Sequence, residues 1–325
     1  MSRIDLSDHN DPYRHCSLCP RECGVDRTQG STGICRSDDT PKVARVSLHM
    51  WEEPPISGSS GSGTIFFSGC SLGCIYCQNH LISRSSVGER FDEVRLADAM
   101  LSLQDQNAMN VNLVTPTHFA PTIRKAITLA KKEGLRIPIV WNTSGYEKMS
   151  CIQSNDGLID IYLSDVKYAE NDLAYRYSSA KGYLDHTLNS IDAMLESVGE
   201  PTFDTFGKDR RMIKGIIVRH MVLPGEINDS KKVLDALFAR YGNSILYSIM
   251  NQYTPVLKTL ANANDDEASS ALKRFSNLGR SVSAEEYEAV LDYADSIGIE
   301  DYFWQDGESC KESFIPDFLT NASGR

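Results

Sequence analysis

The sequence contains no long hydrophobic run and no excess of basic residues. No segment approaches the ~18 consecutive apolar residues that a membrane-spanning helix requires, and the chain from Met1 to Leu6 lacks the apolar core of a secretory signal. The formal net charge is −11, which argues against a broad nucleic-acid-binding surface, because such surfaces are basic. We therefore expect a cytoplasmic protein with no membrane and no nucleic acid among its partners.

Cysteine is the unusual component of the composition. The chain has nine cysteines, and seven of them fall into two tight clusters. Clustered cysteines in a chain without a signal peptide predict metal ligands in a reducing compartment rather than disulfides. The other two, Cys151 and Cys310, are isolated in the sequence and are interpreted as ordinary thiols.

One cluster consists of Cys70, Cys74 and Cys77, with three residues between the first pair and two between the second. Thiolates are the usual ligands of 4Fe–4S clusters, and three thiolates leave a fourth iron open to chelate a substrate. Structural zinc takes four ligands, so three cysteines fit zinc less well. The apolar run 64–68 predicts a short buried strand directly before the cysteines. The cysteines are therefore expected in a loop at the end of a strand.

The second cluster lies in a polar segment, residues 1–45, that is too short to bury much core. It consists of Cys16, Cys19, Cys23 and Cys35. Four thiolates at this density predict a small metal-binding module, and their spacing suits zinc or an iron–sulfur cluster. Residues 46–63, which include the Gly/Ser run 57–63, are expected to form a loop leading to the barrel and lying over the site. No Lys-Ser/Thr follows these glycines, so a phosphate-binding loop is excluded.

From residue 64 to 255, apolar strand-like runs alternate with amphipathic helical runs. This alternation predicts an α/β fold with a parallel sheet and outer helices, and six units fit a partial (β/α)6 TIM-type barrel. Strands are expected over 64–69, 110–115, 137–142, 159–165, 215–223 and 245–250. Helices are expected over 92–104, 119–133, 147–153, 186–198 and 229–240. Residues 256–325 are expected to form a C-terminal helical extension.

Polar residues follow these strands, and in barrels the chemistry lies at the carboxyl ends of the strands. Any one of them alone is more often a helix cap, a turn residue or a surface ion pair. Their repetition at successive strand ends predicts a binding site instead. The residues concerned are Thr115, Thr117, His118, Asn142, Ser144, Asp165, Lys167, Arg219 and Gln252.

These features together resemble the radical S-adenosylmethionine (SAM) enzymes, and within them a branch homologous to the pyruvate formate-lyase activating enzymes. The motifs that carry the resemblance are the cysteine loop, Asn142–Gly145, Asp165–Lys167, Val218–Arg219, Cys16–Val25, Trp51–Gly58, Val114–His118, Ile161–Tyr168 and Gln252–Pro255. The resemblance implies a 4Fe–4S cluster on Cys70, Cys74 and Cys77. SAM would contact Tyr76 and the strand-end residues. The usual Gly-Gly-Glu segment, which supports the SAM amino group, is absent, and 115–118 occupies that strand end.

The implied reaction is reductive cleavage of SAM to a 5′-deoxyadenosyl radical, which removes a hydrogen atom from a substrate. Such an oxidoreductase needs a flavodoxin- or ferredoxin-like electron donor. Two kinds of target stay open: a glycyl-radical enzyme, for which the chain would be an activase, and a small molecule or peptide. An iron–sulfur electron carrier without SAM chemistry fits less well, because it would leave the strand-end polar residues without a purpose.

Overall fold

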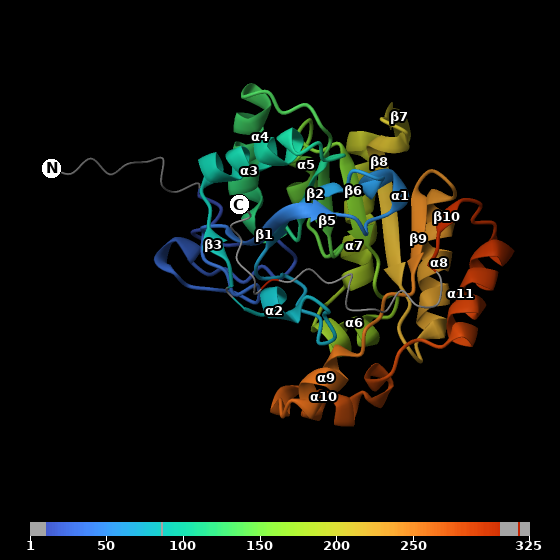
Figure 1. Cartoon of the computed structure of the whole chain (residues 1–325). Helices are drawn as coiled ribbons and strands as arrows, with labels where there is room; N and C mark the ends of the chain where they lie inside the picture. Colours follow the sequence, from blue (N-terminus) through green and yellow to red (C-terminus); the bar gives the residue numbers. More distant parts are fainter. Residues whose placement is uncertain (1–10, 86, 306–317, 319–325) are drawn as a thin grey trace.

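The computed structural model describes residues 11–85, 87–305 and 318. Six parallel strands, adjacent in chain order, form the centre of its sheet (Figure 1). They are β2 (Ser62–Phe67), β4 (Val111–Val114), β5 (Ile139–Thr143), β6 (Ile161–Asp165), β8 (Asp209–Met221) and β9 (Leu246–Met250). The α/β architecture with a parallel sheet predicted from the sequence is therefore confirmed, and its six strands correspond to the six expected ones.

The sheet is open rather than closed into a barrel. At one edge β1 (Lys42–His49) pairs antiparallel with β2, and β3 (Glu89–Arg90) pairs with β1. At the other edge β10 (Tyr302–Phe303) pairs parallel with β9, and β7 (Thr202–Phe206) forms a hairpin with β8. Within the described residues β3 and β10 lie at opposite ends of the strand order. The expectation of a barrel is therefore not confirmed.

Helices cover one face of the sheet and flank its carboxyl end (Figure 1). The helices that pack on the sheet are α3 (Glu93–Asp105), α4 (Ala120–Lys132), α5 (Met149–Gln153), α7 (Tyr183–Val198), α8 (Ile227–Tyr241) and α11 (Ala284–Ile297). The shorter elements are η2 (Arg27–Gln29), α1 (Pro54–Ser57), α2 (His80–Ser83), η3 (Thr117–Phe119), α6 (Asn171–Ser178), α9 (Val256–Asn262), α10 (Asp266–Arg274) and η4 (Ser276–Gly279). Helices α9, α10 and α11 follow residue 255, whereas residues 306–317 and 319–325 of the expected helical extension lie outside the described residues.

Alternation along the strands separates two apolar layers. Trp141 and Tyr162 belong to the large core between sheet and helices, whereas Val140 and Ile161 point to the other face, as the period of two in a strand requires. On that other face Ile56 of α1 is fully buried against them. Helix α1 therefore closes part of the sheet face that the outer helices leave uncovered.

The segment expected to be a loop over 46–63 is more ordered than its composition suggests. Strand β1 begins at Lys42, before the boundary expected at residue 45, and the Gly/Ser run lies largely between α1 and the start of β2 at Ser62. Both Ser57 and Ser62 are buried. The run is a tight connection between packed elements, because its small residues fit where α1 meets the sheet.

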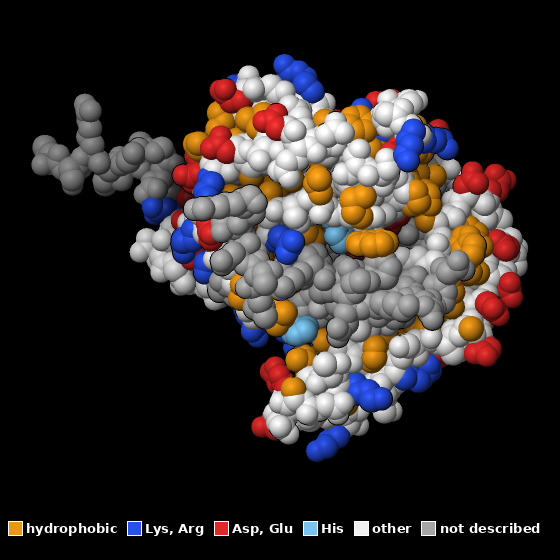
Figure 2. Space-filling model, viewed as in Figure 1, with side chains coloured by type: hydrophobic (Ala, Val, Ile, Leu, Met, Phe, Trp, Pro, Cys, Tyr) orange, Lys and Arg blue, Asp and Glu red, His pale blue; other side chains and the backbone are white. Residues whose placement is uncertain are grey.

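On the face shown in Figure 2, groups of acidic and of basic side chains lie over different helices. Acidic side chains gather over α11, where Glu285, Glu288 and Asp292 are exposed. Basic side chains gather near α9 and α10, which carry the exposed Lys258 and Lys273. Among the described residues, no helix has the length and apolar character needed to cross a membrane.

Candidate active site

A cavity of about 280 Å³ lies at the carboxyl ends of the parallel strands. Its walls bring together residues from the cysteine loop and from the ends of β4, β5, β6, β8 and β9. The sequence-predicted residues that line it are Cys70, Cys74, Cys77, Tyr76, Thr115, Asn142, Ser144, Asp165, Lys167, Arg219 and Gln252. Residues spread over about 180 positions of sequence thus meet in one place, as parallel strands with a common carboxyl edge require.

The cysteine loop, Gly69–Asn79, directly follows β2. Burial raises the pKa of Cys70 to about 12, and the neighbouring Cys74 thiol adds to the shift, while backbone hydrogen bonds from Gly73 and Leu72 oppose it. Burial likewise raises the pKa of Cys77, and the neighbouring Cys74 thiol adds to the shift. Hydrogen bonds of this kind, directed at sulfur, tune iron–sulfur clusters. Three thiols from one loop, facing one cavity, fit a cluster that they would hold together.

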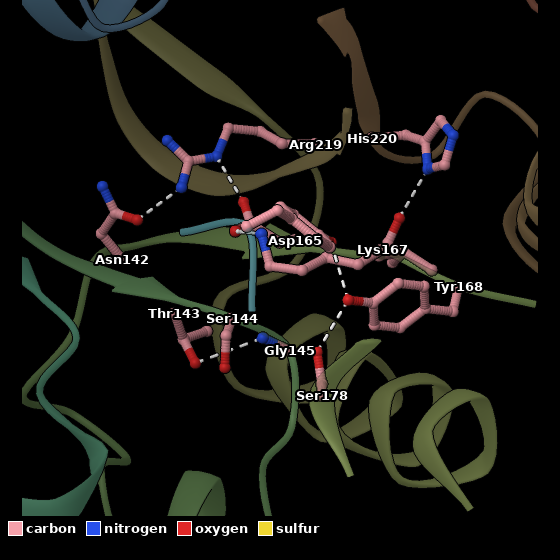
Figure 3. A network of polar contacts seen from close by, with 12 residues as sticks. Asn142, Thr143, Ser144, Gly145, Asp165, Lys167, Tyr168, Ser178, Arg219 and His220 are labelled. Atoms are coloured by element: carbon pink, nitrogen blue, oxygen red, sulfur yellow. Dashed lines mark hydrogen bonds and ion pairs between the residues drawn. The ribbon is translucent and has the colours of Figure 1, made fainter. Parts of the chain in front are cut away.

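A charged network occupies the floor of the cavity (Figure 3). Arg219 donates from Nε to Asp165 at 2.8 Å and from Nη2 to Asn142. Lys167 donates from Nζ to the other carboxylate oxygen of Asp165 at 2.7 Å. Burial alone would raise the pKa of Asp165, but Arg219 and Lys167 outweigh it and hold that pKa below its usual value. Asp165 is therefore ionised and fixes both cations.

Two carboxyls that the sequence reasoning missed lie at this network, and one of them is bonded to it. Glu52 accepts from Arg219 at 3.1 Å and from Asn112 of β4 at 3.0 Å, so one carboxylate connects two separate strands of the sheet. Glu53 also lines the cavity and is 8% exposed. Burial raises the pKa of both carboxyls, against the effect of Arg219. The adjacent Glu-Glu-Pro-Pro was the available signal in the sequence.

The backbone around these strand ends is held by Tyr183 of α7. Its hydroxyl donates to the carbonyl oxygen of Ser144 at 2.7 Å and accepts from the N–H of Lys167 at 3.0 Å. At Gly145, with φ +78°, a Cβ would lie 2.1 Å from the carbonyl oxygen of Asp165. Only glycine allows the β5 and β6 ends to approach this closely. Ser144 and Asp165 are thereby placed side by side at the cavity.

Aromatic residues pack behind the cysteine loop. The hydroxyls of Tyr76 and Tyr168 hydrogen-bond at 2.7 Å. The Tyr168 hydroxyl also hydrogen-bonds to the Ser178 hydroxyl at 2.7 Å (Figure 3). Burial raises the pKa of Tyr76 well above its usual value. Tyr76 thus reaches the cavity as a neutral, fixed ring, the kind of surface on which a planar group packs.

Thr117 and His118, predicted to contact SAM, do not line the cavity. Both are buried in η3, on the helical side of the chain, because the backbone turns at Thr115 with φ +59°. The Thr117 hydroxyl donates to Glu147, and His118 Nε2 meets the carbonyl oxygen of Ser68 at 2.8 Å. Burial lowers the pKa of His118 to about 3, so it is a neutral structural residue. Their placement does not support a contact with SAM.

The four N-terminal cysteines lie near one another. Burial raises the pKa of Cys19 to about 12, and the thiols of Cys35 and Cys16 add to it. Burial and the same two neighbours raise the pKa of Cys23. In the described part of the chain no three His, Cys, Asp or Glu side chains are arranged to hold a metal ion, and this applies to Cys70, Cys74 and Cys77 as well as to the N-terminal cysteines. A second metal on Cys16, Cys19, Cys23 and Cys35 therefore stays a prediction.

The N-terminal segment packs directly on the cysteine loop. Arg21 donates to the carbonyl oxygens of Ser71 at 2.9 Å and Leu72 at 3.0 Å, inside that loop. At Gly69, with φ +85°, a Cβ would lie 2.4 Å from the carbonyl oxygen of Cys35. The two cysteine-bearing segments are thus in contact, and the geometry of one depends on the other.

Comparison with known proteins connects the cysteine loop with iron–sulfur chemistry. Residues 56–181 match the family model described as "4Fe-4S single cluster domain". The match contains the cysteine loop and begins after the N-terminal cysteines. Uncharacterized protein MJ0674 of Methanocaldococcus jannaschii is 26% identical over 300 residues, which cover 89% of this chain and 76% of that protein. The segment 56–181 is therefore similar to domains that hold one 4Fe–4S cluster.

Solved structures with partial likeness include two kinds of protein. A radical SAM methyltransferase from Sphaerobacter thermophilus superposes with a TM-score of 0.47 at 13% identity, covering 75% of this chain and 67% of that one. SuiB from Streptococcus suis, bound to its precursor peptide SuiA, gives a TM-score of 0.47 at 14% identity over 79% of this chain. This chain spans 50% of the length of SuiB in that structure.

Proposed function

We propose that the chain is a radical SAM enzyme that holds a 4Fe–4S cluster on Cys70, Cys74 and Cys77. The observation that carries the proposal is the common cavity, in which these three thiols face the strand-end polar residues. When bound, the cluster and SAM supply reductive cleavage of SAM and, through it, abstraction of a hydrogen atom from a substrate. An external one-electron donor of the flavodoxin or ferredoxin type is part of the proposal.

The residues of the cavity divide into binding groups and groups that position them. Arg219 uses its Nε, Nη1 and Nη2 donors on Asp165, Glu52 and Asn142, so it organises the site. Within the described residues the Lys167 ammonium makes one hydrogen bond, to Asp165, and an ammonium has three donors. Its pKa is lowered by burial but raised more by Asp165 and Cys74. Lys167 is the charged donor we assign to the carboxylate of SAM, near the cluster.

The size of the cavity favours a small substrate over a glycyl-radical protein. Trp51, Glu52 and Glu53 line it from one side, and Phe303, Trp304 and Gln305 from another. These residues come from segments outside the six strand–helix units and reduce the space to about 280 Å³. Such a space favours a small molecule or a peptide side chain over a loop of a folded protein. The activase role is therefore the second candidate.

Lys167→Met tests the assignment. A charge-assisted hydrogen bond is worth ~1.5–3 kcal/mol, so SAM affinity should fall about tenfold to a hundredfold. The experiment uses anaerobically reconstituted protein with dithionite and measures SAM binding and release of 5′-deoxyadenosine. Lys232→Met, which removes an exposed pair with Glu170, is the matched control and should behave like the parent. If the parent forms no 5′-deoxyadenosine under these conditions, the proposed function is wrong.

A further inference from the structure

The Glu53 carboxyl is a buried group in the cavity to which the proposed function gives no partner. It is 8% exposed, and its Oε2 has no hydrogen-bond partner among the described residues. The Ser248 hydroxyl lies beside the carboxyl and lowers its pKa, less than burial raises it. An unsatisfied buried polar oxygen destabilises the fold, so its retention in a cavity points to a ligand that satisfies it.

The charged side chains of the cavity indicate that this ligand is positively charged. Among the described residues, the charged side chains that line it are Glu52, Glu53, Asp165, Lys167 and Arg219. Lys167 and Arg219 are both engaged with Asp165, and Arg219 also with Glu52. His49 lines the cavity too, but burial lowers its pKa to about 4, so it supplies no cation near neutral pH. Three carboxyls thus face two cations, and the Glu53 carboxyl is the one without an ion pair.

The surroundings of Glu53 differ from those of the cysteines. Its neighbours Arg219 and Ser248 are paired positions on β8 and β9. The cysteine loop follows β2, which is four strands from β8 and five from β9 in the sheet order. Lys167, in contrast, interacts with both Cys74 and Cys77. Aromatic residues also line the cavity, Phe303 of β10 among them, and aromatic faces attract cations. The β8–β9 side is therefore the part of the cavity away from the cluster.

We propose that Glu53 binds an aliphatic cationic group of the substrate, an ammonium or a guanidinium, on the β8–β9 side of the cavity. This inference rests on the proposed function and adds the class of substrate. The cation pairs with Glu53 Oε2 and satisfies it, while the remainder of the substrate extends toward the cysteine loop. The SAM ammonium is the competing occupant, and the experiment below separates the two.

The test uses the full chain with its cluster reconstituted, and three small probes. Butylguanidinium and butylammonium carry the charge, and butyramide is an uncharged analogue of similar size. Binding is measured by ligand-observed NMR and by the rise in Tm that each probe causes. Glu53→Gln keeps the shape of the side chain and removes its charge. Glu196→Gln, on the exposed face of α7, makes the same change away from the cavity.

We expect the cationic probes to bind the parent and Glu196→Gln alike, and to lose at least tenfold in affinity in Glu53→Gln. Butyramide should bind none of them measurably, and SAM affinity should stay within about twofold. The Tm of Glu53→Gln without probes should equal or exceed that of the parent, because an unpaired buried carboxyl is removed. Equal binding of the cations to parent and Glu53→Gln would overturn the inference.

A tenfold loss of SAM affinity in Glu53→Gln would also overturn it, since Glu53 would then hold the ammonium of SAM. Failure of the proposed function is a separate outcome, because it appears as absence of 5′-deoxyadenosine in the parent whatever the probes do. A comparison of Nα-acetyl-arginine amide with butylguanidinium identifies the source of the cationic group. Tighter binding of the arginine amide indicates a peptide side chain, and tighter binding of butylguanidinium indicates a small free cation.

Discussion

Replacing Arg219 by Met should destabilise the fold strongly, and in a pH-dependent way. Arg219 lies among the carboxyls of Glu52, Glu53 and Asp165, and it forms ion pairs with two of them. Removing one partner of a buried ion pair costs about 3–5 kcal/mol. We therefore expect a loss of about 3–5 kcal/mol in the free energy of unfolding at pH 8. With ~2 °C per kcal/mol for a chain of this size, Tm should fall by about 6–10 °C.

The pH dependence follows from the carboxyls that remain. In the parent, burial already raises the pKa of Glu52 and Glu53, and loss of Arg219 raises both further. A carboxyl whose pKa is higher in the folded state stabilises the fold at low pH, and that contribution is lost as pH rises through the folded-state pKa. The deficit of Arg219→Met should therefore be small near pH 5 and grow toward pH 8.

The assay is thermal and urea unfolding of the cluster-free protein at pH 5 and pH 8, under anaerobic conditions. Arg240→Met is the matched control, because it breaks an exposed pair with Asp192 and should cost at most about 1 kcal/mol. Adding Glu52→Gln to Arg219→Met should recover part of the loss, since it removes the carboxyl whose ion pair is with Arg219. A deficit below about 1 kcal/mol at pH 8, or an equal deficit at both pH values, would refute the network as described.

Three further outcomes follow from the contacts around the site. Gly69→Ala should lower the iron bound per chain and the Tm, because its Cβ would lie 2.4 Å from the Cys35 carbonyl oxygen. Gly134→Ala is the control and should keep its iron, because Gly134 is also at positive φ but has nothing within 4 Å of its Cβ position. Elemental analysis of a Cys70/Cys74/Cys77→Ala variant should still find zinc or iron near one site per chain on the N-terminal cysteines, and a metal-free folded variant would refute that module. Burial raises the pKa of Glu147 to about 7, so the stability that this carboxyl contributes is lost as pH rises from about 4.5 to 7. Glu147→Gln should therefore flatten that part of the curve of unfolding free energy against pH of the cluster-free protein. An unchanged curve would show that Glu147 is not responsible for it.

The central strands were predictable because each is a short apolar run between helices, and parallel strands buried on both faces read this way. The edge strands were not predictable from the sequence. Strand β1 lies next to a Gly/Ser run typical of linkers, and β3 and β10 have two residues each, too short for any period. Closure of a barrel was also beyond the sequence, since no local pattern distinguishes an open from a closed parallel sheet.

The expectation that polar residues at the carboxyl ends of the strands form the site predicted most of the residues that line the cavity. It did not predict the placement of residues after a turn of the backbone. Asp165 and Arg219 lie in strands, so their alternation fixed the face they occupy. Thr117 and His118 lie beyond the positive φ of Thr115, which sends them to the other side. Glu52 and Glu53 were missed because they enter the cavity from a segment before β2, and strand periodicity carries no information about such a connection.

The central claim is that Cys70, Cys74 and Cys77 hold a 4Fe–4S cluster to which SAM binds. The most direct measurement is electron paramagnetic resonance of the reconstituted, dithionite-reduced protein with and without SAM. The account predicts a reduced-cluster signal that SAM shifts, retained in Cys151→Ala and lost in the Cys70/Cys74/Cys77→Ala variant, whatever signal the N-terminal cysteines add. A SAM-dependent shift that persists in the triple variant, or a parent signal that SAM leaves unchanged, would contradict it.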